Sequence, residues 1–324
     1  MTRPRYLPDN FTLALLGSIG LASFLPVRGY AAQGFEWLTT AAIALLFFLH
    51  GAKLSRAAVV AGMSHWRLHL LVFACTFVLF PILGLLLKPL FGIVLTPDLA
   101  VGMLFLCTLP ATVQSAIAFT AMARGNVAAA VCSASASSLL GVFITPLLVS
   151  WLVVSGGVSG TGNLDAVGRI MLQLLLPFVL GQLLQPWIGD FVRRHASGLK
   201  LVDQGSILLV VYTAFSAAVI EGLWQQVPLP TLLSLTVTCC LLLALSLAMT
   251  TWASRALGFS KEDEIAIVFC GSKKSLASGV PMAKVLFAAH TVGVMLLPIM
   301  LFHQIQLMVC AVLAQRYAKR GHLT

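Results

Sequence analysis

Near the end of the chain, two lysines stand in an otherwise uncharged segment that reads Phe269-Cys270-Gly271-Ser272-Lys273-Lys274-Ser275-Leu276-Ala277-Ser278-Gly279. It stands within residues 263–288, a segment with the length of a membrane span, and its small and charged residues interrupt the apolar pattern. Ile265 to Cys270 is too short to cross a bilayer, because a spanning helix needs about 20 apolar residues. We therefore predict one span made of two half-helices, broken around Gly271-Ser272.

The two adjacent lysines in this stretch are costly at the depth of a bilayer, at about 2.5–3.5 kcal/mol each on insertion scales. Lys273 and Lys274 should therefore face protein or water. Their expected partners are an anionic group of a substrate, backbone carbonyls freed by the helix break, or a proton equilibrium that leaves a lysine neutral. The alternative places both lysines in a cytoplasmic loop next to Lys261–Glu264.

The whole chain has the composition of a membrane protein. Of its 324 residues, 59% are hydrophobic and 9% are charged, which is far from the composition of a soluble domain. Apolar runs predict ten spans, at residues 11–26, 35–52, 67–88, 99–122, 126–153, 166–187, 204–222, 229–253, 263–288 and 291–314. A net charge of +10 would suggest nucleic acid in a soluble protein, but here we assign the basic residues to loops at a membrane surface. We expect an all-α integral membrane protein with no nucleic-acid partner.

The distribution of lysine and arginine predicts the orientation in the membrane. With a cytoplasmic N-terminus, the cytoplasmic segments hold 14 of the 20 Lys and Arg residues, the external segments hold four, and Lys273 and Lys274 lie within the membrane. Both termini are then cytoplasmic, which requires an even number of spans. We expect a multi-pass protein of a bacterial-type inner membrane.

The two halves of the chain resemble each other weakly. In residues 1–155 and in residues 156–324, a leucine-rich first span closes with proline and the fourth span is broken. Because each half has an odd number of spans, the second half must enter the membrane in the opposite orientation. The pattern predicts two inverted five-helix repeats, which are the usual architecture of secondary transporters.

The break in the fourth span reads Leu109-Pro110-Ala111-Thr112-Val113-Gln114-Ser115. Pro110 interrupts the helix, and such a break frees backbone carbonyls that can coordinate a cation. The next span carries Ser133, Ser135 and Ser138, whose neutral oxygens can bind sodium without a carboxylate. The alternative is that these small residues let helices pack closely, and both roles are compatible.

The acidic residues argue against several kinds of chemistry. All ten lie in loops or at span ends, so no carboxylate pair is expected at membrane depth for a proton relay or an intramembrane hydrolase. No GxSxG, HExxH or phosphate-binding loop occurs, and we expect neither an enzyme nor a cofactor. His50 and His303 are buried candidates that ordinary packing would also explain, and His303 and Gln304 give the tenth span a polar face.

Three stretches resemble the bile acid:sodium symporter family, specifically its divergent branch with bacterial, plant and animal members. They are Leu109 to Ser115, the turn Ala123-Arg124-Gly125-Asn126-Val127-Ala128, and Phe269 to Leu276. The similarity runs through nearly the whole chain. It implies a panel of spans one, two, six and seven, and a core of spans three to five and eight to ten, in which spans four and nine cross at their unwound centres. It further implies that organic anions bind between panel and core, and that movement of the core against the panel gives alternating access.

The family's site residues carry over imperfectly. In sodium-coupled members, an acid and a glutamine of span nine bind sodium, and these positions fall near Phe269 and Lys273. The family's Ser-Asn pair is approximated by Gln114-Ser115, and its span-three glutamine falls at Thr76. Our hypothesis is that Lys273 or Lys274 replaces one sodium, which leaves coupling to one sodium, to protons or to nothing. The cation-binding candidates are Thr76, Gln114, Ser115, Ser133, Ser135 and Ser138, and the candidates for substrate binding or cation replacement are Asn126, Ser272, Lys273, Lys274, Ser275, His303 and Gln304.

The leading functional expectation is secondary transport of a small organic anion across the lipid bilayer, with sodium as the candidate coupling ion. Bile acids are not the expected cargo of this branch. The alternative is a regulatory membrane protein that affects calcium homeostasis without net transport of an organic solute, as the animal members suggest. The sequence leaves the substrate, the direction of transport and the formation of a homo-oligomer open.

Overall fold

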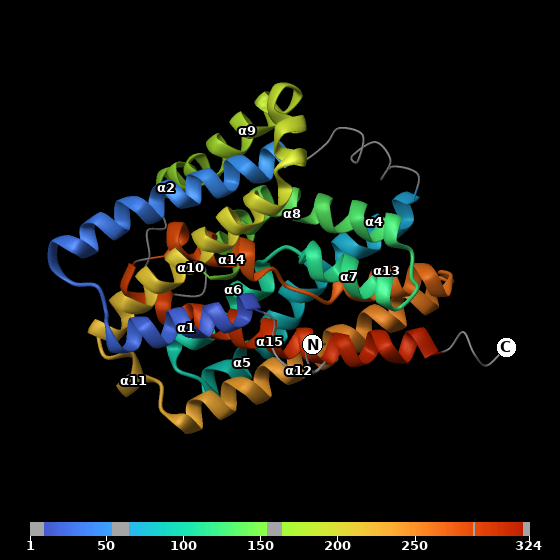
Figure 1. Cartoon of the computed structure of the whole chain (residues 1–324). Coiled ribbons are helices and arrows are strands. Elements are labelled where there is room, and N and C mark those ends of the chain that lie inside the picture. Colours follow the sequence, from blue (N-terminus) through green and yellow to red (C-terminus); the bar gives the residue numbers. More distant parts are fainter. Residues whose placement is uncertain (1–9, 54–64, 154–163, 288, 320–324) are drawn as a thin grey trace, which may run out of the picture.

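The computed structural model describes residues 10–53, 65–153, 164–287 and 289–319, and the regular elements in these ranges are all helices (Figure 1). The first half contains α1 (Asn10–Phe24), α2 (Gly29–Lys53), α4 (Trp66–Ala74), a π-helical segment (Cys75–Leu79), α5 (Phe80–Val94), α6 (Pro97–Thr108), α7 (Gln114–Met122) and α8 (Val127–Leu152). The second half contains α9 (Leu164–Arg194), α10 (Ala196–Ile220), α11 (Leu223–Gln226), α12 (Leu229–Ala256), α13 (Lys261–Gly271), α14 (Leu276–Leu286) and α15 (Ala289–Lys319).

Within the described residues, seven helices are long and apolar enough to cross a membrane. They are Gly29–Lys53, Trp66–Val94, Val127–Leu152, Leu175–Arg194, Ala196–Ile220, Leu229–Ala256 and Thr291–Lys319. The apolar helix α6 and the apolar part of α1 are shorter. The all-helical class is therefore confirmed, whereas the predicted count of ten spans requires pairing α6 with α7 and α13 with α14.

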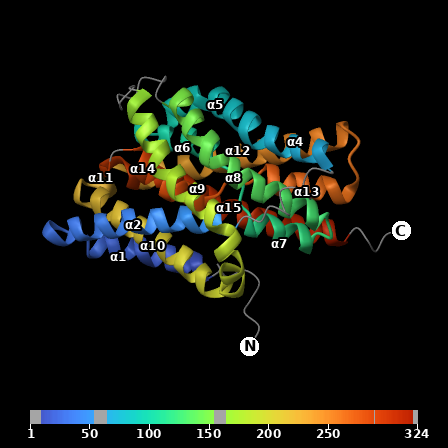
Figure 2. The same cartoon turned by 90° about the horizontal axis from the view of Figure 1, so that it is seen from above.

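The helices pack in two sets that α10 connects. In one set, α2 lies along α9 and α1 lies along α10 (Figures 1 and 2). In the other set, α15 contacts α6, α7, α12 and α14, and α13 contacts α4, α7, α8 and α12. Because α10 also packs against α14 and α15, it joins the two sets.

The close approach of α2 and α9 depends on one glycine in each helix. A Cβ atom on Gly51 would overlap the backbone carbonyl of Phe178, and a Cβ atom on Gly181 would overlap that of Phe48. Any other side chain would push the helices apart, so the absence of a Cβ atom permits backbone contact at both positions.

Both predicted helix breaks occur, and local chemistry explains where the half-helices begin and end. Leu109 leaves α6 with an extended backbone (ψ 151°), because the residue before a proline is disfavoured in the helical region. The Ser260 hydroxyl accepts a hydrogen bond from the Asp263 N–H and caps the start of α13, and the Ser275 hydroxyl caps α14 in the same way through the Ser278 N–H.

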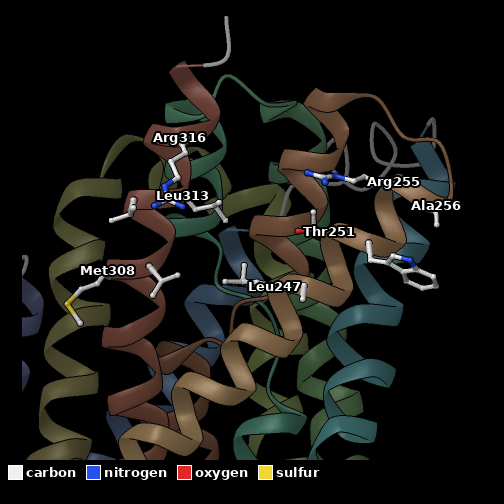
Figure 3. A pocket seen from close by; sticks show the side chains of 11 residues that line it. Leu247, Thr251, Arg255, Ala256, Met308, Leu313 and Arg316 are labelled. Atoms are coloured by element: carbon white, nitrogen blue, oxygen red, sulfur yellow. The ribbon is translucent and has the colours of Figure 1, made fainter.

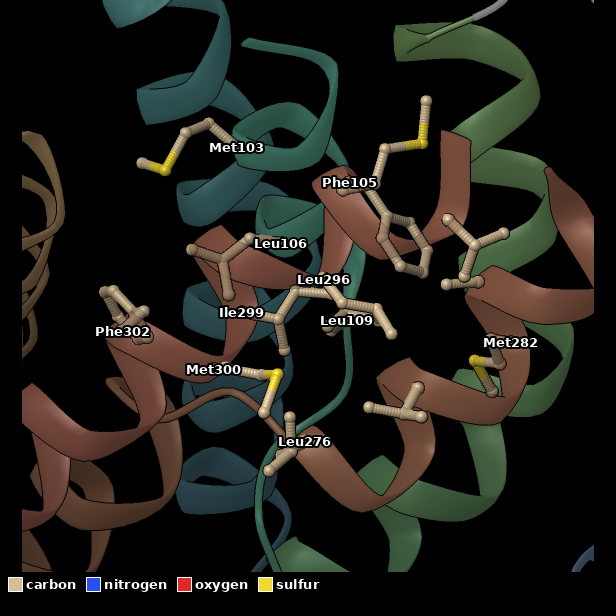
Figure 4. Close-up of a cluster of buried hydrophobic side chains, with 14 of the residues drawn as sticks. Met103, Phe105, Leu106, Leu109, Leu276, Met282, Leu296, Ile299, Met300 and Phe302 are labelled. Atoms are coloured by element: carbon tan, nitrogen blue, oxygen red, sulfur yellow. The ribbon is translucent and has the colours of Figure 1, made fainter. Parts of the chain in front are cut away.

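The largest apolar core surrounds the ends of the half-helices. Leu106 and Leu109 from the first break lie close to Leu276 from α14 and to Ile299 and Met300 from α15 (Figure 4). All five side chains are buried. This packing fixes the ends of the half-helices on both sides of the breaks.

Candidate functional site

The two helix breaks contact each other in the interior of the molecule. The backbone N–H of Ser275 donates a hydrogen bond of 2.9 Å to the carbonyl oxygen of Pro110, which joins the segment between α13 and α14 to the segment between α6 and α7. Residues 109–112 and 272–275 are all buried. Because irregular backbone is costly in an apolar interior unless its polar groups are satisfied, the partners of these groups define the site.

Two hydroxyl groups of α8 satisfy part of the first break. Ser137 accepts a hydrogen bond of 3.1 Å from the N–H of Ala111, and Thr145 donates one of 2.9 Å to the carbonyl oxygen of Thr108. Both hydroxyls are buried. The serine- and threonine-containing face of α8 therefore supports the unwound segment.

Lys274 donates hydrogen bonds to the carbonyl groups around the contact between the breaks. Its side chain is 1% exposed, and its ammonium donates hydrogen bonds to the carbonyl oxygens of Thr76 (2.8 Å), Cys107 (3.2 Å) and Leu109 (2.7 Å). The ammonium also lies 4.0 Å from the centroid of the Phe80 ring, whose face attracts a cation. Thr76 belongs to the π-helical segment, an irregularity of a kind that is frequent at functional sites.

Gln306 of α15 holds the backbone of Lys274 in place. Its side-chain oxygen accepts a hydrogen bond of 3.0 Å from the Lys274 N–H, and its side-chain nitrogen donates one of 3.0 Å to the Lys274 carbonyl. The same nitrogen lies 2.9 Å from Nδ1 of His303. The second break is thereby tied to α15 through a fully buried amide.

Lys273 is equally buried but has different surroundings. Among the described residues its ammonium has no hydrogen-bond partner, and its side chain is 0% exposed. The nitrogen lies 4.0 Å from the centroid of the Phe119 ring and 5.6 Å from that of the Phe269 ring. The two aromatic faces are therefore its main source of electrostatic stabilisation.

A cavity adjoins the breaks between α2 and α10 on one side and α7, α8, α14 and α15 on the other. It measures about 240 Å³. A second cavity of about 190 Å³ lies beside it, and the two share the lining residues His50, Gln114, Ser138 and Asp203. Hydroxyl and amide groups of the half-helices and of α8 face this space, which is large enough for a small solute.

The charged groups of the cavity come from α2 and α10. Lys53, Lys200 and Asp203 line it together with the imidazole of His50, and Lys53 forms an ion pair with Asp203. The charges of Lys53 and Asp203 cancel, so the charge of Lys200 gives the lining a net positive charge. The cavity is therefore suited to an anion.

Of the residues singled out from the sequence, several meet at this cavity. Gln114, Ser115, Ser138, Ser275 and His303 line the larger part of it. Ser135 lines the smaller part. The structure thus gathers six candidates from α7, α8, α15 and the second break around one space.

Other candidates have partners away from the cavity. The hydroxyls of Thr76 and Ser272 bond to backbone carbonyls in their own helices, those of Val72 (2.8 Å) and Val268 (2.6 Å). Ser133 lies 2.7 Å from Nδ1 of His69. Thr76 contributes to the site through its carbonyl group instead, and Lys274 rather than Lys273 reaches that group.

Asn126 and Gln304 lie outside the contact between the breaks. Asn126 caps α8 by accepting a hydrogen bond from the Ala129 N–H, and its amide donates to Asp263 at the start of α13 (2.8 Å). Gln304 lines a separate apolar cavity between α1, α12 and α15. Asn126 thus links α8 to α13, and Gln304 lies in a different part of the bundle from the contact between the breaks.

Sequence reasoning missed several residues of the site. Gln306 lies three residues after His303 in the last span, and its partner Lys274 is 32 positions away. The ion pair between Lys53 and Asp203 joins residues 150 positions apart. No local pattern signals either contact, because both depend on how the helices are placed in space.

Comparisons with known proteins agree with this architecture. The model of the SBF-like CPA transporter family matches residues 9–319. The chain is 69% identical to "Uncharacterized protein PA2026" of Pseudomonas aeruginosa over 99% of this chain and 96% of that protein. It is 60% identical to "Putative symporter YfeH" of Escherichia coli, over 96% of this chain and 93% of the relative.

More distant relatives carry names of the same kind. The chain is 27% identical to "Sodium/bile acid cotransporter 7" of Rattus norvegicus over 95% of this chain and 92% of that protein. The match to the family model over almost the full length confirms the resemblance that the sequence stretches indicated, and it identifies a multi-pass membrane transporter rather than an enzyme. The chain belongs to the SBF-like CPA transporter family.

Proposed function

We propose that the protein is a secondary transporter of a small organic anion that works by alternating access around the contact between the two helix breaks. The observation that carries this proposal is the ammonium of Lys274, which is buried among the carbonyl oxygens of Thr76, Cys107 and Leu109. Burying a charge is costly, and in membrane proteins an ionisable residue at this depth marks a substrate or ion pathway.

Lys274 takes the place and the charge of one bound cation. Three carbonyl oxygens within 3.2 Å form the kind of oxygen-rich surroundings that a hard cation takes. Coupling then requires at most one sodium ion. The neutral oxygens of Gln114, Ser115, Ser135 and Ser138, which line the cavity, are its candidate ligands.

The anion is proposed to bind in the adjoining cavity. Lys200 and His50 from the α2 and α10 side face hydroxyl and amide groups of the half-helices across this space. The start of α14 opens toward the cavity through Ser275 and Ser278, and a helix N-terminus favours a negative charge. This combination supports an organic anion more strongly than a cation or a neutral solute.

The proposed architecture has ten spans in two inverted repeats, residues 1–155 and 156–324. Helices α1, α2, α9 and α10 form the panel, and the remaining spans form the core. Two reciprocal contacts support the repeat: α2 of the first half packs along α9, the first span of the second half, while α10 packs along α1. Both termini are proposed to lie in the cytoplasm at a bacterial inner membrane.

Transport in proteoliposomes tests this function. Purified protein would be offered labelled monocarboxylates, dicarboxylates, sulfonates and taurocholate under sodium, potassium or proton gradients. We expect saturable uptake of at least one class, and a decrease of at least tenfold in Lys274→Ala. Lys319→Ala, which changes an exposed lysine at the end of α15, is the matched control and should transport normally.

Two results would contradict the proposal. Uptake that is unchanged in Lys274→Ala would remove the role of the buried ammonium. A complete lack of anion flux, together with altered calcium entry in cells that express the protein, would favour a regulatory protein instead.

A further inference from the structure

A long groove runs between α12 and α15 on the outside of the helix bundle. It encloses about 980 Å³ and is lined by apolar side chains over most of its length, among them Leu247, Met308 and Val312. Met308 is 63% exposed and Val312 is 52% exposed, so the chain itself leaves these side chains open among the described residues. The groove lies apart from the proposed transport cavity, and none of its lining residues lines that cavity.

The two ends of the groove differ in charge. Arg255 of α12 and Arg316 of α15 lie at the same end of the groove but on opposite sides of it, while Leu247 and Met308 lie farther along the groove (Figure 3). Trp252, which is 70% exposed, lines the groove on the α12 side near the arginines. A tryptophan beside arginines at the end of an apolar helix is typical of the headgroup level of a bilayer.

The positive charge of this end is only partly neutralised. The buried carboxylate of Glu264 binds both Arg255 (3.0 Å) and Lys261 (2.6 Å), so that two cations share one anion. Arg316 adds a further cation across the groove and is exposed. The charged side chains that line the groove are those of Arg255 and Arg316, so its lining presents positive charge beside an apolar channel.

We propose that this groove binds an anionic phospholipid, with its phosphate beside Arg316 at the arginine end and an acyl chain along Leu247, Met308 and Val312. Arg255 holds Glu264 through Nε (3.1 Å) and Nη2 (3.0 Å), so Arg316 is the main phosphate ligand and Arg255 adds positive charge nearby. Guanidinium groups form strong hydrogen bonds with phosphate oxygens, and the apolar channel continues from this end in the direction that an acyl chain takes. Charge at one end and apolar surface along the rest match this amphipathic molecule. If a second copy of the chain covered the groove instead, it would have to place a negatively charged group at the arginine end.

Lipid titration of the full-length protein tests the proposal. Delipidated protein in detergent would be titrated with phosphatidylglycerol or with phosphatidylcholine of the same acyl chains, and binding would be followed by native mass spectrometry and by the rise in melting temperature. We expect tighter binding of phosphatidylglycerol by the wild-type protein. This comparison requires no variant and therefore does not depend on the folding of one.

Variants then locate the lipid. Arg316→Gln should weaken phosphatidylglycerol binding about tenfold, which corresponds to about 1.4 kcal/mol. Arg194→Gln, which removes an exposed arginine at the end of α9, is the matched control and should bind as the wild type does. Val312→Trp should fill the channel and weaken the binding of both lipids.

Several outcomes would overturn the proposal. Equal affinity for the two lipids would remove the role of the charge, and an unchanged affinity in Arg316→Gln or Val312→Trp would place the lipid elsewhere. A lipid-free dimer that Val312→Trp dissociates would show that a second copy of the chain covers the groove.

Discussion

Lys273 and Lys274 are neighbours in sequence, but their ammonium groups have different environments. That of Lys274 binds three backbone carbonyls, whereas that of Lys273 lies 4.0 Å from the centroid of the Phe119 ring and 5.6 Å from that of the Phe269 ring. Successive residues of an irregular segment point in different directions, so two identical side chains reach different partners. A hydrogen-bonded ammonium and one held by aromatic faces should respond differently to removal.

Lys274→Ala should create a site that binds sodium, and sodium should then stabilise the variant. Removal of the ammonium leaves the carbonyls of Thr76, Cys107 and Leu109 without their donor, at a cost of about 3 kcal/mol or more in a buried site. Because sodium prefers such oxygen ligands, it should recover part of this loss. The measurement is the melting temperature in sodium chloride and in potassium chloride, and the difference should be larger in the variant than in the wild type.

Lys273→Ala is the matched control for this experiment. It removes an equally buried ammonium that has no carbonyl partner among the described residues, and it should gain no additional sodium response. An equal gain in both variants would show that general loss of positive charge, rather than an emptied carbonyl site, attracts the ion.

At the scale of the elements, the half-helices and the long helices are fixed by different means. The half-helices depend on caps and on contacts between polar groups, such as those of Ser260 and Ser275. The long helices depend on close packing, for which Gly51 and Gly181 are examples. Substitutions at these two kinds of position should therefore lower the stability of the protein by different mechanisms.

Gly181→Ala should destabilise the protein even though alanine favours a helix. Its Cβ atom would overlap the carbonyl of Phe48, so α2 and α9 must separate, at a cost of about 1–3 kcal/mol. Gly20→Ala in α1 is the control, because a Cβ atom there has no neighbour within 4 Å and alanine should be neutral or slightly stabilising. Thermal unfolding measures both changes, and equal melting temperatures for the two variants would contradict this explanation.

Glu264→Gln should weaken the attachment of α13 to α12 and α15. The Glu264 carboxylate is 1% exposed and binds Arg255, Lys261 and the hydroxyl of Tyr317 (2.9 Å). Loss of its charge leaves two cations without their shared partner, but their side chains are 53% and 55% exposed and stay solvated, so we expect a loss of about 1.5 kcal/mol in the free energy of unfolding.

Glu262→Gln provides the comparison for this variant. Glu262 lies in the same turn of α13 but is exposed, so its loss should change stability by less than about 0.5 kcal/mol. Similar unfolding curves for the two variants would show that the Glu264 cluster contributes little.

At the scale of the whole molecule, the cavity is formed by parts of the chain that are distant in sequence. The α2 and α10 side supplies its charged groups, and the α7, α8 and α14 side supplies neutral polar groups. Movement of one side against the other would expose an anion bound between them to either surface. The positive groups on the α2 and α10 side should therefore determine the affinity for the anion.

Lys200→Gln should weaken binding of the proposed anion without preventing folding. Removal of one partly solvated charge is expected to cost about 1 kcal/mol, which raises KM roughly fivefold with little change in kcat. Lys88→Gln in α5, also exposed but outside the cavity, should leave KM unchanged. A KM that is equal in the two variants would move the anion site away from this cavity.

The membrane character, the helical class and the two breaks can be predicted from the amino-acid sequence. These properties depend on local composition: long apolar runs, Pro110, and two lysines set in an apolar segment. The sequence also pointed to six of the polar residues that line the cavity, because polar residues are few in the spans and each one is conspicuous.

The tertiary structure alone decided which groups meet. Lys274 bonds to the carbonyl of Thr76, 198 positions away, and the Lys53–Asp203 pair and the α12–α15 groove likewise join distant segments. In the tertiary structure, Asn126 caps α8 and Gln304 lines a separate apolar cavity. The physical reason is that apolar patterning specifies which residues are buried, whereas the direction of each buried polar side chain depends on how the helices pack.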